Sequence, residues 1–191
     1  LKINTNATLL TEKLIHSLLS SDMQTIVFSI DEKNKENYEK IRVNAKFEKI
    51  MKNLDLLKNI REKNYRNSKL KIRISGVKIN TDQNVEEMNK FYSEFADEIV
   101  LVDYDPWESA YDNDVNNIDD ECSELYRRMF VWHDGKVNPC DYDYKSMLSK
   151  WNANKDSIKS IWNSEYYNNI RSLHKSKKRN IIEPCKRCIS T

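Results

Sequence analysis

The sequence predicts a mixed α/β protein in two parts, and two observations support this prediction. Residues 1 to about 104 alternate between short apolar segments and amphipathic ones, as strands and helices do along a parallel sheet. All four cysteines follow residue 121, in a region with short strand signals and a glycine-containing turn. We therefore expect a larger α/β domain followed by a small, cysteine-rich α+β domain.

The first part contains strand and helix signals in alternation. Four apolar segments predict strands, namely Leu1–Asn4, Gln24–Asp31, Leu70–Asn80 and Glu98–Asp105. Three segments with helical spacing predict helices, namely one that begins at Thr11, then Lys46–Asn64 and Val85–Asp97. In parallel sheets the chemistry lies at the carboxyl ends of the strands, so polar residues there, including Asn80 and Asp103, are candidate ligand contacts.

The acidic, Asn-rich segment from Asp105 to Glu121 separates the two parts. It has almost no aliphatic residues, which is typical of a linker. We predict a first domain over residues 1–112, a linker over 113–121 and a second domain over 122–191.

Charge and composition restrict the class of partner. The net charge of +2 gives no electrostatic reason to expect specific binding of nucleic acid. Basic residues gather between Arg171 and Arg187, where we expect a solvated helix face. No apolar run reaches about 18 residues and no signal peptide is visible, so we expect no membrane contact and a cytoplasmic location. In that compartment cysteines are free thiols or metal ligands more often than disulfides.

The cysteine pattern predicts a metal centre. The stretch from Val131 to Cys140 reads as a hairpin with a two-residue Asp134-Gly135 turn of type I′, which would fix the position of Cys140. Cys185 and Cys188 form a Cys-x-x-Cys pair, and Cys122 precedes the hairpin. Four unrelated buried thiols and a structural zinc site are the alternatives. Zinc usually takes two Cys-x-x-Cys pairs, whereas four thiolates at this looser spacing suit an iron–sulfur cluster.

Two motif sets resemble a known family. Thr5 to Lys58 resembles the middle of a radical S-adenosylmethionine (SAM) enzyme, whose pattern is Thr-Asn-Gly, a strand ending Ser-Ile-Asp-Gly, and then Tyr-x-x-Ile-Arg. The region from Cys122 onward resembles the SPASM or twitch auxiliary-cluster domain, with Cys, then Gly-x4-Cys, a helix and Cys-x-x-Cys. Ser157 to Ser176 is similar to the helix of that pattern.

The resemblance implies a fold and a set of ligands. The fold is a partial (β/α)6 radical SAM barrel followed by a SPASM/twitch domain. The implied ligands of an auxiliary [4Fe-4S] cluster are Cys122, Cys140, Cys185 and Cys188. With every iron held by protein, such a cluster would serve electron transfer or structure. The implied contacts to SAM are Thr5, Asn6, Ser29, Asp31 and Arg42. No catalytic residue is assigned.

Alternative roles exist for the SAM candidates. Ser29 and Asp31 could cap the following helix. Arg42 could form a surface ion pair with Glu39 or Glu48.

The chain departs from the family pattern in two respects. The Cys-x3-Cys-x2-Cys motif of the SAM-cleaving cluster and the Gly-Gly-Glu-Pro strand after it are absent, and the chain begins at what would be the third strand. Ala7 and Glu32 stand where the family has glycines, which puts close backbone approach there in doubt.

Two functions follow as expectations. In the first, the chain is part of a radical SAM oxidoreductase that uses a 5′-deoxyadenosyl radical to modify a peptide, sugar or small metabolite, with an electron-donor protein as partner. In the second, it is a non-catalytic module, stapled by a metal or cluster, that docks a peptide or partner protein. The missing motif assigns catalysis to a longer parent protein.

Overall fold

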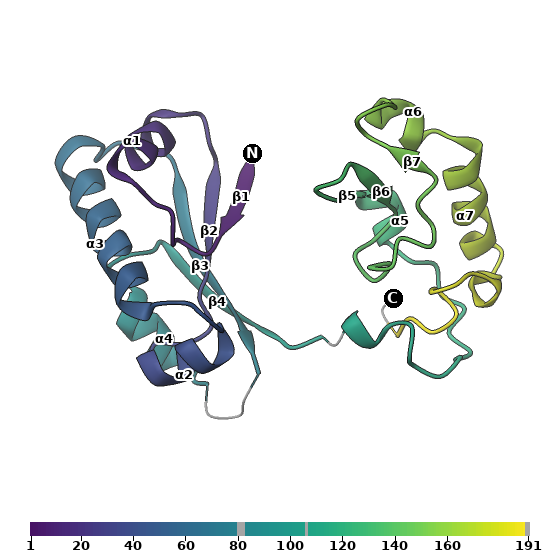
Figure 1. Ribbon diagram of the computed structural model, residues 1–191, viewed down its shortest axis with the longest axis horizontal. Helices are drawn as coiled ribbons and strands as arrows, with labels where there is room; N and C mark the ends of the chain where they lie inside the picture. Colours follow the sequence, from purple (N-terminus) through teal and green to yellow (C-terminus); the bar gives the residue numbers. More distant parts are fainter. Residues whose placement is uncertain (80–82, 106, 190–191) are drawn as a thin grey trace. The chain divides into compact units, whose positions relative to one another are not determined.

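The computed structural model describes residues 1–79, 83–105 and 107–189. The chain divides into two compact units, Leu1–Tyr104 and Asp105–Thr191 (Figure 1). In the described residues no helix combines the length and the apolar character that a membrane crossing requires.

The first unit is built on a four-stranded, all-parallel sheet, which confirms the predicted α/β class. Its strands lie in the order β1-β2-β3-β4, with bounds β1 Lys2–Thr5, β2 Thr25–Ser29, β3 Lys71–Lys78 and β4 Glu98–Asp103. Each strand follows its predecessor in the sheet as in the chain, so all four carboxyl ends lie along one edge.

Four helices connect these strands, namely α1 Glu12–Ser20, α2 Lys35–Ile41, α3 Phe47–Asn64 and α4 Val85–Tyr92. The α1 helix begins where predicted, because the Thr11 hydroxyl accepts a hydrogen bond from the Leu14 N–H at 3.3 Å. The α2 helix was not predicted, and Asn34 caps it through the Asn37 N–H at 3.1 Å.

The helices of this unit cover one face of the sheet (Figure 1). On that face the strand residues Ile26, Phe28, Ile72 and Ile74 are buried, and they share a core with apolar residues of the helices. The side chains that alternate with them are largely polar and point to the other face, namely Asn4, Ser29, Arg73, Ser75 and Glu98. We call this second surface the open face.

The second unit contains a small antiparallel sheet, β5 Phe130–Val131, β6 Lys136–Asn138 and β7 Trp151–Asn152. The β5–β6 hairpin was predicted, but its turn type was wrong. The Gly135 N–H donates to Trp132 O at 2.8 Å, and the Trp132 N–H donates to Lys136 O at 2.9 Å, so the loop has three residues. Gly135 has a positive φ of 84° and Asp134 does not, which excludes type I′ and fits a turn followed by a left-handed glycine.

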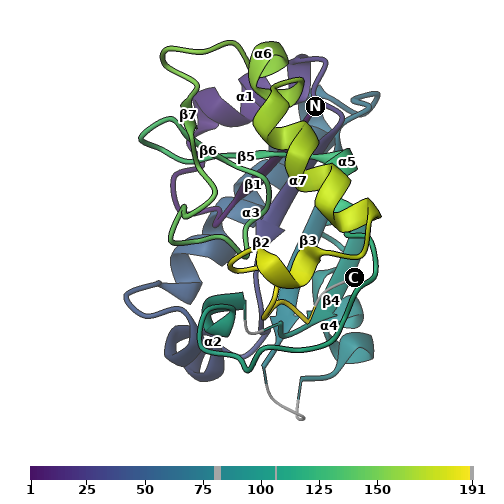
Figure 2. The same cartoon turned by 90° about the vertical axis from the view of Figure 1, so that its right-hand side faces the viewer.

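Five further short elements complete the second unit, namely η1 Trp107–Ser109, α5 Glu124–Arg127, α6 Ile158–Trp162, α7 Glu165–Lys175 and η2 Arg179–Ile181. The predicted helix over Ser157–Ser176 is therefore two helices, since Ser164 starts α7 by accepting a hydrogen bond from the Tyr167 N–H. The α7 helix leads into the C-terminal loop that carries Cys185 and Cys188 (Figure 2).

The acidic segment lies within the second unit, and part of it packs on the C-terminal loop. The Asn116 N–H donates to Lys186 O at 3.1 Å, and its side-chain amide donates to Cys188 O at 3.3 Å. The Arg187 guanidinium donates to Asn113 O at 2.7 Å. The stretch predicted as a linker thus makes ordered contacts around the last two cysteines.

Candidate functional site

No disulfide joins the four cysteines, and three separate segments carry them. Cys122 precedes α5, Cys140 follows β6, and the other two lie in the C-terminal loop. Cys185 is buried in an apolar cluster with Leu125 and Ile182, and Cys122 packs against the same cluster. The fold therefore brings the beginning and the end of the second unit to one place.

Electrostatics connects the four sulfur atoms. Burial raises the pKa of the Cys140 thiol, and negative charge on each of the other three cysteines would raise it further. Burial and the neighbouring thiols raise the pKa of Cys185 to about 12. The four thiols thus share one neighbourhood. Within the described residues, no group of three or more His, Cys, Asp or Glu side chains is arranged to hold a single metal ion.

Cys140 is held by the loop after the hairpin. The Asp143 backbone N–H donates to the Cys140 sulfur and opposes the rise in its pKa. The Asp143 carboxylate, which is fully buried, accepts from the N–H groups of Met147 and Leu148 at 2.8 and 2.9 Å, and from the Tyr111 hydroxyl. Burial raises the pKa of Asp143, so this carboxyl group depends on those donors for its charge.

The C-terminal loop is organised by Arg179. Its guanidinium donates to Cys188 O at 3.0 Å, to Cys185 O at 3.3 Å and to Asp120 O at 3.3 Å. Asp120 lies two residues before Cys122, so one side chain ties together segments that carry three of the four cysteines. Arg179 is 1% exposed, so the expectation of a solvated basic face is wrong at this position.

The donor set fits an iron–sulfur cluster. Four thiols without disulfides supply the ligands that such a cluster takes. The raised pKa values of Cys140 and Cys185 disfavour free thiolates at these two positions, and a bound metal centre removes that penalty because it deprotonates coordinating thiols. A backbone N–H directed at the Cys140 sulfur is the kind of hydrogen bond that stabilises a metal-bound thiolate.

A second candidate region lies at the carboxyl edge of the parallel sheet. Asp31, just beyond β2, accepts two hydrogen bonds from Arg42, at 2.5 and 3.1 Å, and one from the Val77 N–H at 2.9 Å. The Asp31 bond and the charge of Asp31 raise the pKa of Arg42. The two candidate residues are therefore partners of each other, and neither Glu39 nor Glu48 pairs with Arg42 in the described structure.

Arg42 also lines a cavity of about 410 Å³. Asn6, another SAM candidate, lies on its wall with Tyr38, Lys46 and Lys49. Three cations on one small cavity favour an anionic group as its occupant.

The remaining SAM candidates have separate local roles. The Thr5 hydroxyl accepts from the Ala7 N–H at 3.3 Å, and the side-chain Oδ1 of Asn6 accepts from the Thr8 N–H at 3.1 Å. Ser29 ends β2, half-buried on the open face. The structure shows no helix cap by Ser29 or Asp31, since Asn34 takes that role for α2.

The other positions that the sequence singled out lie in different surroundings. Asp103 ends β4 and is exposed, whereas Asn80 lies outside the described residues. Ala7 has a positive φ of 62°, which explains a glycine at this place in the family pattern. Glu32 is buried, and its carboxylate accepts from the Lys33 N–H at 2.7 Å.

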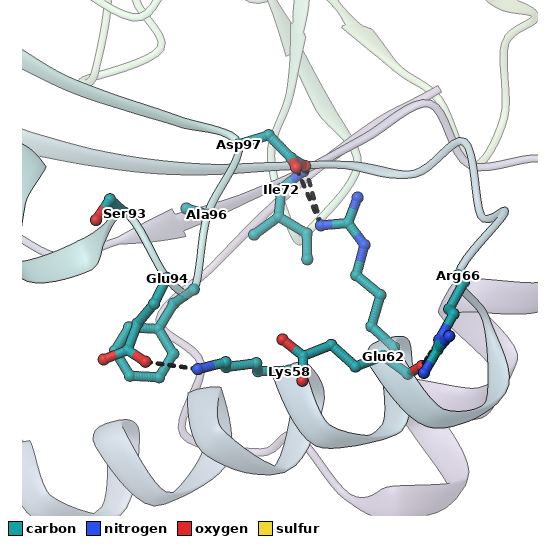
Figure 3. Close-up of a pocket in the computed structure, with 10 residues that line it drawn as sticks. Lys58, Glu62, Arg66, Ile72, Ser93, Glu94, Ala96 and Asp97 are labelled. Atoms are coloured by element: carbon teal, nitrogen blue, oxygen red, sulfur yellow. Dashed lines mark hydrogen bonds and ion pairs between the residues drawn. The ribbon is translucent and has the colours of Figure 1, made fainter.

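The cavity in Figure 3, of about 490 Å³, lies at the other end of the sheet, where β3 and β4 begin. Two ion pairs span this cavity, Lys58 with Glu94 at 2.5 Å and Arg61 with Asp97 at 3.1 Å. Asp97 also accepts from the Ile72 N–H at 2.7 Å. These pairs join α3 to the segment before β4, so they explain the cavity as part of the scaffold.

The chain is similar to known proteins in part of its sequence and in its fold. Residues 122–189 match the model of the SPASM family, an iron–sulfur cluster-binding domain. None of the curated proteins matches the chain. SuiB of Streptococcus suis, solved with bound S-adenosylmethionine, is similar with a TM-score of 0.61 and 18% identity over 90% of this chain. The chain spans 49% of the length of SuiB.

Two structures of BtrN also match. BtrN in an open conformation has a TM-score of 0.42 and 17% identity, covering 99% of this chain and 92% of BtrN. BtrN with AdoMet and 2-DOIA has a TM-score of 0.43 and 16% identity, covering 95% and 79%. At these identities the structural likeness concerns the fold alone. The predicted resemblance of the region from Cys122 onward to the SPASM domain is thus confirmed by the match over residues 122–189, and the fold of the chain is similar to that of SuiB.

Proposed function

We propose that the chain is part of a radical SAM enzyme and that its four cysteines hold one auxiliary [4Fe-4S] cluster. One observation carries this proposal. Four cysteines from three segments, none of them in a disulfide, share an electrostatic neighbourhood inside the stretch that matches the SPASM model.

The protein would control this centre through its own groups. A bound cluster supplies one-electron transfer. The apolar residues around Cys185 keep water away, the Asp143 N–H donates to the Cys140 sulfur, and Arg179 fixes the C-terminal loop. Four protein ligands leave no open iron for substrate, so electron transfer or structural support is the role that fits.

The SAM site is proposed at the carboxyl edge of the sheet. The Arg42 side chain is 33% exposed and lines the cavity beside Asn6, which supports a role for its guanidinium in binding the SAM carboxylate. The Asp31 side chain is 2% exposed, and its ion pair with Arg42 orients the guanidinium. Thr5 and Ser29 end the adjacent strands β1 and β2 at the same edge of the sheet.

We assign to the parent enzyme the modification of a peptide, sugar or small metabolite by a 5′-deoxyadenosyl radical, with electrons from a donor protein. Four cysteines without a disulfide are in keeping with a cytoplasmic location.

Iron analysis tests the cluster. Purified without oxygen, the chain should be brown and bind about four irons. Colourless protein with stoichiometric zinc would overturn the cluster assignment. The double variant Cys185→Ser/Cys188→Ser should lose the iron, and hydrogen exchange should rise in Asp105–Thr191 and stay unchanged in Leu1–Tyr104. An equal rise in both units would contradict separate roles.

The gene provides a second test. A coding sequence upstream of Leu1 that contains Cys-x3-Cys-x2-Cys supports the radical enzyme. If translation begins near Leu1, SAM cleavage has no cluster to drive it, and the non-catalytic docking module remains.

A further inference from the structure

Arg179 is a charged side chain in an unusual place. It opens η2 and is 1% exposed, although it belongs to the most basic stretch of the chain. Removing a guanidinium from water is costly unless the surrounding groups compensate for its lost hydration. The burial of Arg179 therefore calls for surrounding groups that compensate for the lost hydration of its guanidinium.

The partners of Arg179 identify the place it serves. Both cysteines of the Cys-x-x-Cys pair accept hydrogen bonds from Arg179 through their backbone carbonyl groups. Cys185 O accepts from Nε at 3.4 Å and from one terminal nitrogen at 3.3 Å, and Cys188 O accepts from the same terminal nitrogen at 3.0 Å. The other terminal nitrogen reaches Asp120 O at 3.3 Å. A planar fork with several donors can bridge three carbonyl groups in this way, whereas a lysine ammonium cannot match its geometry.

The positive charge is fixed beside the sulfur atoms. His174 is equally buried at 1% exposure, and both of its ring nitrogens lack hydrogen-bond partners, so it is neutral at pH 7. Asp143 is a buried acidic group near both Cys140 and Cys185. Arg179 is thus the buried cation that the fold places at the Cys-x-x-Cys end of the site.

We propose that Arg179 is a positioning residue that fixes the Cys185–Cys188 loop, and that its buried charge raises the reduction potential of the auxiliary cluster. This inference rests on the proposed function. When the oxidised cluster takes one electron from an external one-electron reductant, no bond breaks and the centre gains one negative charge. A nearby positive charge in a medium of low dielectric stabilises the reduced form more than the oxidised form.

The experiment is an anaerobic redox titration of the iron-loaded chain with dithionite, followed by electron paramagnetic resonance. Three variants are compared with the unmodified chain. Arg179→Gln removes the charge, and Arg179→Lys keeps the charge but loses the fork. Arg171→Gln is the matched control, because Arg171 also donates to backbone carbonyl groups, Leu125 O at 3.0 Å and Trp162 O at 2.8 Å, and not to those of the cysteines.

We expect Arg179→Gln to disfavour reduction about tenfold, which for a one-electron couple is about 59 mV to more negative potential. Arg179→Lys should keep the potential of the unmodified chain and lose iron faster on exposure to a chelator. Arg171→Gln should leave both the potential and the iron retention unchanged.

Other results would contradict the charge effect or the proposed function. Full iron loading of Arg179→Gln at an unchanged potential would overturn the charge effect. If Arg179→Gln fails to hold iron, Arg179→Lys provides the test. A reduction equilibrium for this variant that differs tenfold or more from that of the unmodified chain, about 59 mV, would overturn the charge effect. An unmodified chain that binds no iron would instead refute the proposed function, whereas normal iron loading with unresponsive Arg179 variants would refute this inference alone.

Discussion

Arg42 and Asp31 form a two-point ion pair at the carboxyl edge of the sheet, with Nε 2.5 Å from Oδ2 and a terminal nitrogen 3.1 Å from Oδ1. The pair is unequally buried. The Asp31 side chain is 2% exposed, whereas one third of the Arg42 side chain remains in contact with solvent. The two partners therefore differ in what happens when one is removed.

We predict that Arg42→Met destabilises the first unit more than Asp31→Asn. Loss of Arg42 leaves a buried carboxylate with the Val77 N–H as its remaining donor, which should cost about 3 kcal/mol of unfolding free energy. Loss of the Asp31 charge leaves a guanidinium that reaches water, at a cost of about 1 kcal/mol. Urea unfolding followed by circular dichroism measures both values. The control is Lys35→Met, which removes an exposed ion pair with Glu48 and should leave the unfolding free energy nearly unchanged. A larger loss of unfolding free energy for Asp31→Asn than for Arg42→Met would contradict the effect of unequal burial.

Replacement of Ala7 by glycine should stabilise the first unit. Ala7 has a positive φ of 62°, a conformation that costs a residue with a Cβ roughly 1 kcal/mol. Ala45 lies in the same unit without a positive φ, so Ala45→Gly should destabilise by up to about 1 kcal/mol. Thermal unfolding of the two variants gives the comparison, and a fall in melting temperature for both would rule out relief of backbone strain at Ala7.

Gly76→Ala should damage the same edge of the sheet. A Cβ at Gly76 would lie 2.5 Å from Ile30 O and 2.8 Å from the Asp31 Cα, and both of these are backbone atoms. Overpacking of this kind costs about 2 kcal/mol. Ser75→Ala, on the open face one residue earlier, should change the unfolding free energy by less than about 0.5 kcal/mol. Chemical denaturation measures the difference, and equal small effects would mean that β3 can shift away from the loop after β2.

The second unit should lose stability in mild acid because of His174. Burial, followed by the charge of Arg179, lowers the pKa of His174 to about 4, below its ordinary value of 6.5. Because the folded pKa is the lower one, the neutral imidazole contributes its full stability above pH 6.5. This contribution is lost as the pH falls toward 4, by about 2 kcal/mol between pH 7 and pH 5.

Hydrogen exchange in Asp105–Thr191 at the two pH values tests this prediction. His174→Leu should remove most of the difference between them, whereas replacement of the exposed His133 by Gln should leave it intact. An unchanged pH dependence in His174→Leu would assign the acid sensitivity to another group.

Much of the first unit follows from sequence pattern, because burial of one sheet face imposes regular spacing. Apolar runs gave all four strands, and the spacing of Phe47, Ile50, Leu54 and Leu57 gave α3. The α2 helix carries little such signal, since its segment is mostly charged and only Tyr38 is buried. The Arg42–Asp31 pair joins two irregular segments, whose spatial relation no periodicity encodes.

The candidate metal centre was foreseen only in part. The cysteine spacing and the hairpin were visible in the sequence, whereas the turn type depended on hydrogen bonds between Trp132 and Lys136. Arg179 gave no signal, because arginine in a basic stretch is ordinarily at the surface. Its burial results from carbonyl groups that only the folded loop brings together. A cation spaced a few residues before a Cys-x-x-Cys pair is the one clue that a reader of the sequence would have had.

The helices of the first unit bury one side of the sheet, and the alternating side chains Asn4, Ser29 and Ser75 stay outside that packing. Evolution can exchange these residues one by one without loosening the hydrophobic interior. Selectivity for a bound molecule and durability of the scaffold can then change independently, which suits a fold reused for diverse chemistry.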